Sequence, residues 1–221
     1  MKENSFSFGH KLREIYAGDR PPKLMPERFK GIKNKKPALI GVQFMGDLFH
    51  ESIPFHWVDD VFSVFNLCPQ HTFLVLTKRI KRMLEWYNQT DISGWGSGDY
   101  NSNTWLGVTI CTQDELWKVE ELMKIPAAVR FISVEPILGE IDFDFGATFI
   151  EVATPDGFGY VKKPLPDWII IGQETGPGAR PAKAEWFNDI IRQCRAVGVP
   201  VFVKKAPAGV EIIRGYPKNG T

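Results

Sequence analysis

Cysteine is scarce in this chain of 221 residues, and the few cysteines present already exclude several classes of protein. Cys68, Cys111 and Cys194 are odd in number and widely spaced, which argues against a disulfide framework and against a Cys-x-x-Cys metal site. Cys68 and Cys194 fall within apolar helical patterns, so we expect both to be packed in the core. Cys111 follows Thr109 near the predicted site, and a structural role is again favoured over a reactive one.

The chain also lacks a dominant charge and a long hydrophobic run. It has 27 basic and 26 acidic residues, for a formal net charge of +1. This balance argues against a dedicated polyanion-coating protein and leaves room for a local basic patch. The first residues include no apolar signal segment, and no apolar run is long enough to span a bilayer. We therefore expect a cytoplasmic protein that does not contact membranes.

What the chain does contain is a set of apolar runs that alternate with amphipathic helical patterns about every thirty residues, the size of a βα unit. The runs are continuously apolar, as in strands buried on both faces. The six predicted strands are Ala38–Met45, Phe73–Leu76, Trp105–Val108, Val129–Ile132, Trp168–Ile171 and Val199–Val203. The predicted helices are His56–Leu67, Lys81–Asn88, Thr112–Ile125, in which Thr112 and Glu115 form a capping-box pattern, and Ala184–Val197, which Gly198 ends.

This order predicts an α/β fold, a parallel-stranded incomplete (βα)6-type TIM-like barrel with helices outside and a β-hairpin insertion. Residues 1–37 are interpreted as an N-terminal basic arm and residues 38–221 as a single domain. Within that domain, residues 89–103 form an inserted loop and residues 148–163 an inserted hairpin. Trp57, Trp117, Trp168 and Trp186 fit core positions. Six strands do not close a barrel of eight, so Ala38–Met45 should lie at an open edge, which the N-terminal arm, a second copy or a partner chain would cover.

Six stretches, in order, carry a resemblance that extends from about Pro22 to Pro207. They are Pro26-Glu27-Arg28-Phe29; Met45-Gly46-Asp47-Leu48-Phe49-His50-Glu51; Pro69-Gln70-His71-Thr72-Phe73 running into Leu76-Thr77-Lys78-Arg79; Trp105-Leu106-Gly107-Val108-Thr109; Pro126-Ala127-Ala128-Val129-Arg130-Phe131 running into Glu135-Pro136; and Gly176-Pro177-Gly178-Ala179-Arg180-Pro181. In these segments the chain resembles a phage-associated family, largely uncharacterised, whose members carry an N-terminal motif of three cysteines.

The resemblance implies a partial barrel similar to the radical S-adenosylmethionine enzymes, in which three cysteines near the first strand hold an iron–sulfur cluster. This sequence departs from that pattern because no clustered cysteines precede Asp47. The usual Gly-Gly-Glu-Ser-Gly reads Gly172-Gln173-Glu174-Thr175-Gly176, and the usual Phe-Lys-Gln-Trp reads Val203-Lys204-Lys205-Ala206. Cluster chemistry is therefore not transferred and the cofactor stays unassigned. The chain is expected to be a shortened relative that lost the activity, or one whose missing strand another chain supplies.

Polar and charged residues follow nearly every predicted strand, at the end where barrels of parallel strands carry their sites. The candidate catalytic residues are Asp47, Glu135 and Glu174. If they converge, their repulsion would raise the pKa of at least one carboxyl and make it a general acid or base, or the three could bind a hard cation such as Mg²⁺. The alternative, left open here, is that they form structural ion pairs with Lys78, Arg79, Arg180, Lys204 or Lys205.

The candidate ligand-binding residues are cations and small residues at the same strand ends. They are Lys78, Arg79, Thr109, Gly176, Gly178, Arg180 and Lys204. Cations together with backbone amides ahead of a helix can hold a phosphate or a carboxylate. The Gly-Pro-Gly stretch by itself also fits a tight turn between a strand and a helix.

Three functional hypotheses follow. The first is a degenerate or incomplete radical S-adenosylmethionine-like phage protein, whose polar pocket at the strand ends binds a small anionic or nucleotide-like ligand. The second is a non-catalytic module that binds nucleic acid or assembles with a partner, through basic residues of the arm: Lys23, Arg28, Lys30, Lys33, Lys35 and Lys36. The third is a metal-assisted hydrolase that uses the three carboxylates.

Overall fold

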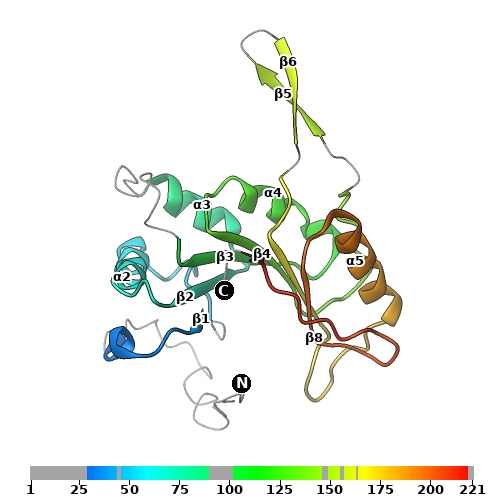
Figure 1. The fold of residues 1–221 in the computed structure, drawn as a ribbon, viewed down its shortest axis with the longest axis horizontal. Coiled ribbons are helices and arrows are strands. Elements are labelled where there is room, and N and C mark those ends of the chain that lie inside the picture. The colour runs from blue at the N-terminus through cyan, green and yellow to red at the C-terminus, as the bar shows by residue number, and fades with distance from the viewer. Residues whose placement is uncertain are drawn as a thin grey trace.

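A six-stranded parallel sheet forms the centre of the protein, in a computed structural model that describes residues 29–43, 46–89, 102–145, 149–154, 157–162 and 164–218 (Figure 1). The strands lie in the order β1-β2-β3-β4-β7-β8. Their bounds are β1 Leu39–Val42, β2 Thr72–Thr77, β3 Thr104–Thr109, β4 Val129–Val134, β7 Trp168–Gly172 and β8 Val201–Lys205. The sheet curls into a half-barrel, so the predicted incomplete TIM-like barrel is confirmed.

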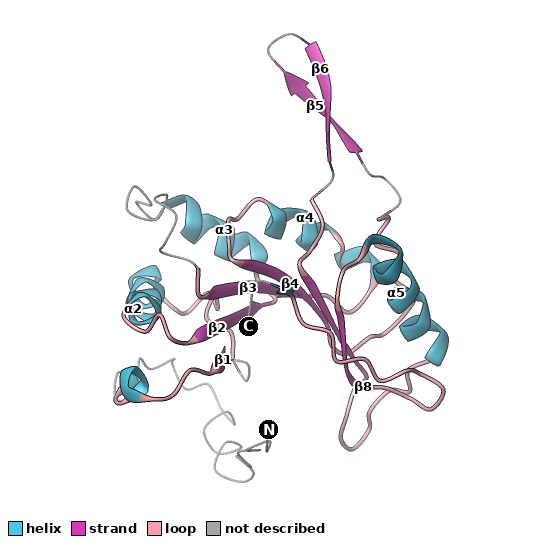
Figure 2. Cartoon of the chain, viewed as in Figure 1, coloured by secondary structure: helices cyan, strands magenta, loops and turns pink. Residues whose placement is uncertain are grey.

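Helices pack against the outer face of this sheet (Figure 2). They are α2 Phe55–Asn66, α3 Ile80–Gln89, α4 Trp117–Met123 and α5 Ala184–Val197, and short 3-10 turns cover η2 Ile32–Asn34 and η4 Gln113–Glu115. α5 has the predicted bounds, and Gly198 ends it with a φ of 77°, a left-handed conformation that glycine adopts without strain. None of the described helices is both long and apolar enough to cross a membrane.

The helix predicted for Thr112–Ile125 is wrong in its first half. Residues 113–115 form a 3-10 turn, α4 begins only at Trp117, and the side chain of Thr112 makes no capping hydrogen bond. Both side chains of the expected capping box bond elsewhere: the Thr112 side chain hydrogen-bonds the Asp114 carboxylate, and the Glu115 carboxylate accepts from the backbone N–H of Cys111.

The predicted insertion at 148–163 is an antiparallel hairpin of β5 Phe149–Thr154 and β6 Gly157–Lys162. It forms a two-stranded sheet of its own and extends away from the half-barrel in Figure 1. Most of the other predicted insertion, residues 90–101, lies outside the described residues, as do residues 1–28 of the predicted arm. The division of the chain into an arm and one domain stays a prediction.

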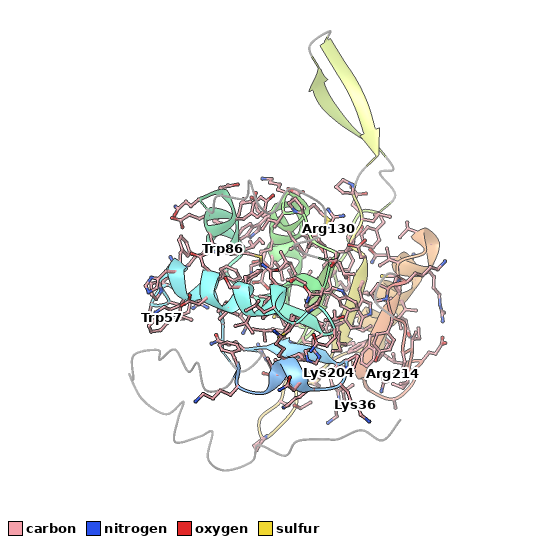
Figure 3. The ribbon with its side chains drawn as sticks, turned by 60° about the vertical axis from the view of Figure 1, so that its left-hand side comes forward. Lys36, Trp57, Trp86, Arg130, Lys204 and Arg214 are labelled. Carbon is pink, nitrogen blue, oxygen red and sulfur yellow. The ribbon has the colours of Figure 1, made fainter. Side chains whose placement is uncertain are left out.

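The core between sheet and helices is built by alternate strand residues. Phe73 and Val75 of β2 face the helices, and Leu74 between them faces the other way. Trp86 of α3, labelled in Figure 3, is buried against Phe62 of α2, with ring centroids 4.5 Å apart, and its indole N–H donates to Asp59. Trp168 is buried as predicted, whereas Trp117 is 41% exposed and lies under the Lys81 ammonium, so the core position predicted for Trp117 is wrong.

The concave face of the half-barrel carries an aromatic layer of its own. Trp105, Phe131 and Trp168 project from neighbouring strands and are all buried. The ring of Phe131 lies on Gly107, its partner across the β3–β4 ladder, so closely that a β-carbon there would fall 2.4 Å from a ring atom. Glycine at this position is therefore a packing requirement rather than a turn signal.

The two edges of the sheet differ. The edge of β8 is covered by the C-terminal segment: Gly215 N–H donates to Val201 C=O, and Val203 N–H donates to Ile213 C=O. β1 lies at the other edge, as predicted, and no strand of the described residues pairs with its outer side. Next to β1, His71 donates a ring N–H to Ile32 C=O, which ties η2 to the start of β2.

Candidate functional site

The carboxyl ends of the six parallel strands meet at one edge of the half-barrel, and we call the polar residues there the C-terminal rim. Its members are Asp47, Thr77, Lys78, Arg79, Thr109, Cys111, Glu135, Glu174, Arg180 and Lys204. Because every strand runs in the same direction, the sheet places these residues at the same end. All ten of the predicted site residues lie at this end or in the loop after β7.

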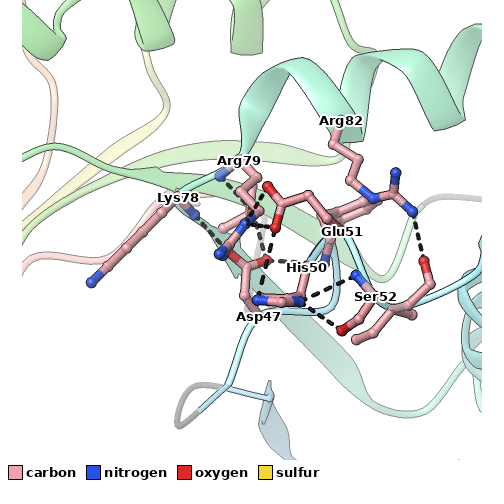
Figure 4. Close-up of polar contacts among 10 residues, drawn as sticks. Asp47, His50, Glu51, Ser52, Lys78, Arg79 and Arg82 are labelled. Atoms are coloured by element: carbon pink, nitrogen blue, oxygen red, sulfur yellow. Dashed lines mark hydrogen bonds and ion pairs between the residues drawn. The ribbon is translucent and has the colours of Figure 1, made fainter. Parts of the chain in front are cut away.

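Asp47 accepts hydrogen bonds with both carboxylate oxygens (Figure 4). One carboxylate oxygen accepts hydrogen bonds from Phe49 N–H at 2.9 Å and from the Thr77 hydroxyl at 2.7 Å. The other accepts from Lys78 N–H at 3.1 Å and from the Arg79 guanidinium at 3.0 Å. Its side chain is 10% exposed. Asp47 therefore joins the loop after β1 to the end of β2.

Arg79 is held by a second carboxylate, Glu51, which accepts from the Arg79 Nε–H at 2.9 Å. Partial burial by itself lowers the pKa of Arg79, but its hydrogen bonds with Glu51 and Asp47 outweigh that effect and raise the pKa above the ordinary value. The Lys78 side chain, by contrast, points away from this network in Figure 4. It is exposed and forms no ion pair with any described residue.

Glu135 crosses the rim from β4 to β8. It accepts a hydrogen bond from the Ser133 hydroxyl at 3.2 Å, and its other oxygen lies 3.2 Å from the Lys204 ammonium. β7 runs between these two strands, and Gly172 is the β7 residue beneath the carboxylate. A β-carbon on Gly172 would lie 2.6 Å from Glu135 Oε1, so the missing side chain is what lets Glu135 occupy this position.

Glu174 and Arg180 form the most regular pair of the rim. The carboxylate accepts two hydrogen bonds from the guanidinium, at 2.7 and 3.1 Å, and a third from the Arg180 backbone N–H at 2.9 Å. Gly176 and Gly178 have φ values of 105° and 77° in the loop between them, a conformation that favours glycine. These three hydrogen bonds, those from the Arg180 side chain first, lower the pKa of Glu174 to about 2.

Lys118 of α4 is a buried cation near the end of β3, and the sequence did not single it out. Its ammonium contacts the Glu115 carboxylate and lies 3.5 Å from Thr109 C=O. Burial raises the pKa of the Cys111 thiol and Glu115 raises it further, while the positive charges of Lys78, Lys118 and Arg180 act in the opposite direction. Lys78 follows β2 and Arg180 follows β7, so cations from different strands act on one point of the rim.

The three candidate carboxylates do not form one acidic cluster. Asp47 pairs with Arg79, Glu135 with Lys204 and Glu174 with Arg180. The pKa of Glu174 is lowered, opposite to the rise that mutual repulsion would give. Within the described ranges, no group of three or more His, Cys, Asp or Glu side chains is placed to hold a metal ion. The geometry therefore matches the ion-pair alternative.

The missed residues are Glu51, Glu115 and Lys118. The Glu115–Lys118 spacing of three residues is a signal that the sequence did contain, since such neighbours face each other in a helical turn. Glu51 had no such signal, because its partner Arg79 follows another strand.

The cysteines do not fit an iron–sulfur cluster. Cys68 and Cys194 are buried, 2% and 0% exposed, and Cys111 is half-buried. Cys68 follows α2 and Cys194 lies within α5, so the three thiols belong to different parts of the fold. No step through such a cluster is derived for this chain.

In native protein, Cys111 should be the cysteine that reacts with a thiol reagent, and slowly, because burial and Glu115 raise its pKa. Cys194 should not react, since burial raises its pKa to about 12, and Cys68 is shielded by packing. The measurement is the number of thiols titrated before and after denaturation. Cys111→Ser should abolish the native reaction, and rapid reaction of all three native thiols would contradict this packing.

The Glu174 carboxyl should titrate at about 2, followed by its carbon chemical shift in a pH series. Arg180→Gln should return the midpoint toward the ordinary 4.5. Because the folded-state pKa is depressed, the pair stabilises the protein above about 4.5 and its contribution is lost as pH falls toward 2. A wild-type midpoint near 4.5 would mean that the pair does not persist in solution.

This fold and this rim define an α/β half-barrel with a charged strand-end edge. Residues 9–211 match the model of the family described as "Protein of unknown function (DUF5131)", and the chain belongs to that family. The comparison with curated proteins found no match. The comparison with solved structures found none either.

Proposed function

We propose that this protein is a degenerate or incomplete radical S-adenosylmethionine-like half-barrel, of phage or mobile-element type, whose C-terminal rim binds a small anionic or nucleotide-like ligand in the cytoplasm. The relation to that enzyme group and to phages rests on the sequence resemblance, and the ligand class rests on the rim. No catalytic step is part of the proposal, because each candidate carboxylate is engaged by its own cation.

The observation that carries the proposal is the environment of Lys78. Its backbone N–H is fixed by Asp47, so the residue starts from a defined position, while its ammonium is exposed and has no ion pair within the described part of the chain. A lysine held this way is available to an anion without first breaking an internal contact.

Two other cations support the same ligand class. Lys204 is 65% exposed although it pairs with Glu135, so an anion can approach it from solvent. Arg180 is 60% exposed although it pairs with Glu174, so an anion can approach it from solvent as well. A phosphate or carboxylate that contacts more than one of these groups would gain charge-assisted hydrogen bonds.

The test is thermal and calorimetric binding of inorganic phosphate, pyrophosphate and adenosine monophosphate to the full chain. A ligand of the native state raises the melting temperature by mass action. Lys78→Gln should weaken binding about ten-fold, the cost of one hydrogen bond to a charged group. Lys124→Gln is the matched control, because Lys124 is an exposed lysine that follows the last residue of α4 and is not a member of the rim. Absence of binding by all three probes, or equal binding by Lys78→Gln, would refute the proposal.

A second candidate function, nucleic-acid binding, is favoured by a separate basic stretch. Lys33, Lys35 and Lys36 are exposed and form no ion pair with described residues. Lys23 and Arg28 of the predicted arm lie outside the described residues. Three phosphate contacts predict that log affinity falls with log salt with a slope of about −3. The triple change Lys33→Gln, Lys35→Gln, Lys36→Gln should remove that slope, and salt-independent binding would reject this candidate. The metal-assisted hydrolase has no comparable support.

A further inference from the structure

We propose that the outer edge of β1 pairs antiparallel with the same edge of a second copy of this chain, so that two half-barrels share one continuous sheet. The proposal concerns the outer backbone edge of β1, whereas the ligand proposal rests on side chains after β2, β7 and within β8. It rests on the backbone of β1, on the side chains along it and on the order of charges around it.

The backbone of β1 leaves a self-complementary set of hydrogen-bonding groups. Thr72 N–H donates to Ala38 C=O, which shows that Ala38 turns its backbone toward β2. Since neighbours in a strand point in opposite directions, Ile40 also faces β2, and Leu39 and Gly41 present their N–H and C=O groups to the open edge. An antiparallel pair centred on Ile40 sets Leu39 of each copy opposite Gly41 of the other. All four exposed groups of each strand then have partners.

The side chains suit this register. Leu39 is 47% exposed, and Gly41 has no side chain to compete with it. In the paired edge, Leu39 of one copy would cover Gly41 of the other on the concave face, next to the apolar layer that Leu74 begins. Pairing therefore removes the exposed apolar surface of Leu39 from water at this edge of the sheet.

The charges around β1 favour the antiparallel direction and a copy of the same chain. Exposed Lys35 and Lys36 precede the strand, and Glu51 follows it, paired with Arg79 but still exposed. Antiparallel pairing brings the basic start of one strand beside the acidic end of the other, twice by symmetry. The Glu51 side chain is 68% exposed and so accessible to such a neighbour.

The opposite edge of the sheet, that of β8, is covered within the same chain. β8 is capped by the chain's own C-terminal segment, through a bridge between Phe202 and Arg214. Exposed strand edges are otherwise blunted by charge or by bulges. β1 has neither device, since its four residues are Leu39, Ile40, Gly41 and Val42.

The experiment is sedimentation of the full chain over a concentration series, with amide hydrogen exchange at Leu39 and Gly41. Wild-type protein should be dimeric at micromolar concentrations, and both amides should become protected as dimer forms. Leu39→Lys should sediment as a monomer, and Gly41→Pro should weaken the dimer at least ten-fold because it removes an edge N–H. Circular dichroism confirms that each variant is folded.

The matched control is Leu67→Lys, which adds the same charge at a leucine that is 63% exposed at the end of α2, and it should stay dimeric. A monomeric wild-type protein overturns the proposal. If its two amides are nevertheless protected, another segment of the chain covers β1. A dimer that Leu39→Lys leaves intact overturns it as well, because the interface would then lie elsewhere.

Discussion

Replacing Gly107 with alanine should lower the free energy of unfolding by about 1–3 kcal/mol, the usual cost of overpacking a core. Three ring atoms of Phe131 lie within 2.6 Å of the position that the new β-carbon would take. Phe131 cannot retreat without disturbing Trp168, whose ring centroid is 6.0 Å from its own, and Phe131 is fully buried. Gly107→Val should cost more, because it adds two further methyl groups at the same point. Chemical denaturation with an unchanged slope is the measurement.

Two further variants make this prediction specific. The double variant Gly107→Ala, Phe131→Leu should lose less unfolding free energy than the two single variants lose together. The reason is that the smaller leucine makes room for the methyl group of Ala at position 107. Gly139→Ala is the control, because a β-carbon there meets nothing within 4 Å, and it should change stability by no more than about 0.5 kcal/mol. Equal losses for Gly107→Ala and Gly139→Ala would mean that the Phe131 ring does not lie over Gly107.

Replacing Asp47 with alanine should lower the free energy of unfolding by about 2–4 kcal/mol. The change removes the acceptor for two backbone N–H groups, the Thr77 hydroxyl and the Arg79 guanidinium. Three of these four donors belong to the end of β2, so the loop after β1 would lose its buried attachment to that strand. Arg79 would keep Glu51, which limits the loss.

Asp47→Asn separates the two halves of this network. The amide oxygen can still accept from Phe49 N–H and Thr77, but its NH₂ group would face the N–H groups of Lys78 and Arg79, so the loss should lie between wild type and alanine. Glu51→Ala is the matched control. Its carboxylate is exposed and its loss should have a much smaller effect on unfolding. If Glu51→Ala were as destabilising as Asp47→Ala, the assignment of Asp47 as the anchor of this end would be wrong.

The core strands could be predicted because parallel strands buried on both faces are continuous apolar runs. Phe73–Leu76 lies within β2 and Val129–Ile132 within β4, and the structure extends each by one or two residues. The predicted strand Ala38–Met45 was too long, since Gln43 has a φ of 50° and β1 ends at Val42. An apolar run does not reveal where the backbone leaves the strand.

The charge pairing of the rim could be foreseen only as one of two alternatives. Asp47, Glu135 and Glu174 stand at strand ends in the sequence whether they repel one another or pair with cations. Local geometry distinguishes repulsion from pairing. For example, Gly172 has no side chain, and this leaves room for the Glu135 carboxylate to reach Lys204. Local geometry also decided the partner of Glu115, whose carboxylate accepts from the Cys111 N–H instead of capping a helix.

The sequence by itself determined the half-barrel and the end at which its polar residues gather, because hydrophobic periodicity and the parallel βα order are local properties of the chain. The tertiary structure alone decided which carboxylate meets which cation, that Lys78 keeps an exposed ammonium, and that one sheet edge is capped while the described residues leave the other uncovered. Those outcomes depend on distances of a few ångströms between residues on different strands, and such distances exist only once the sheet has curled and its side chains have packed.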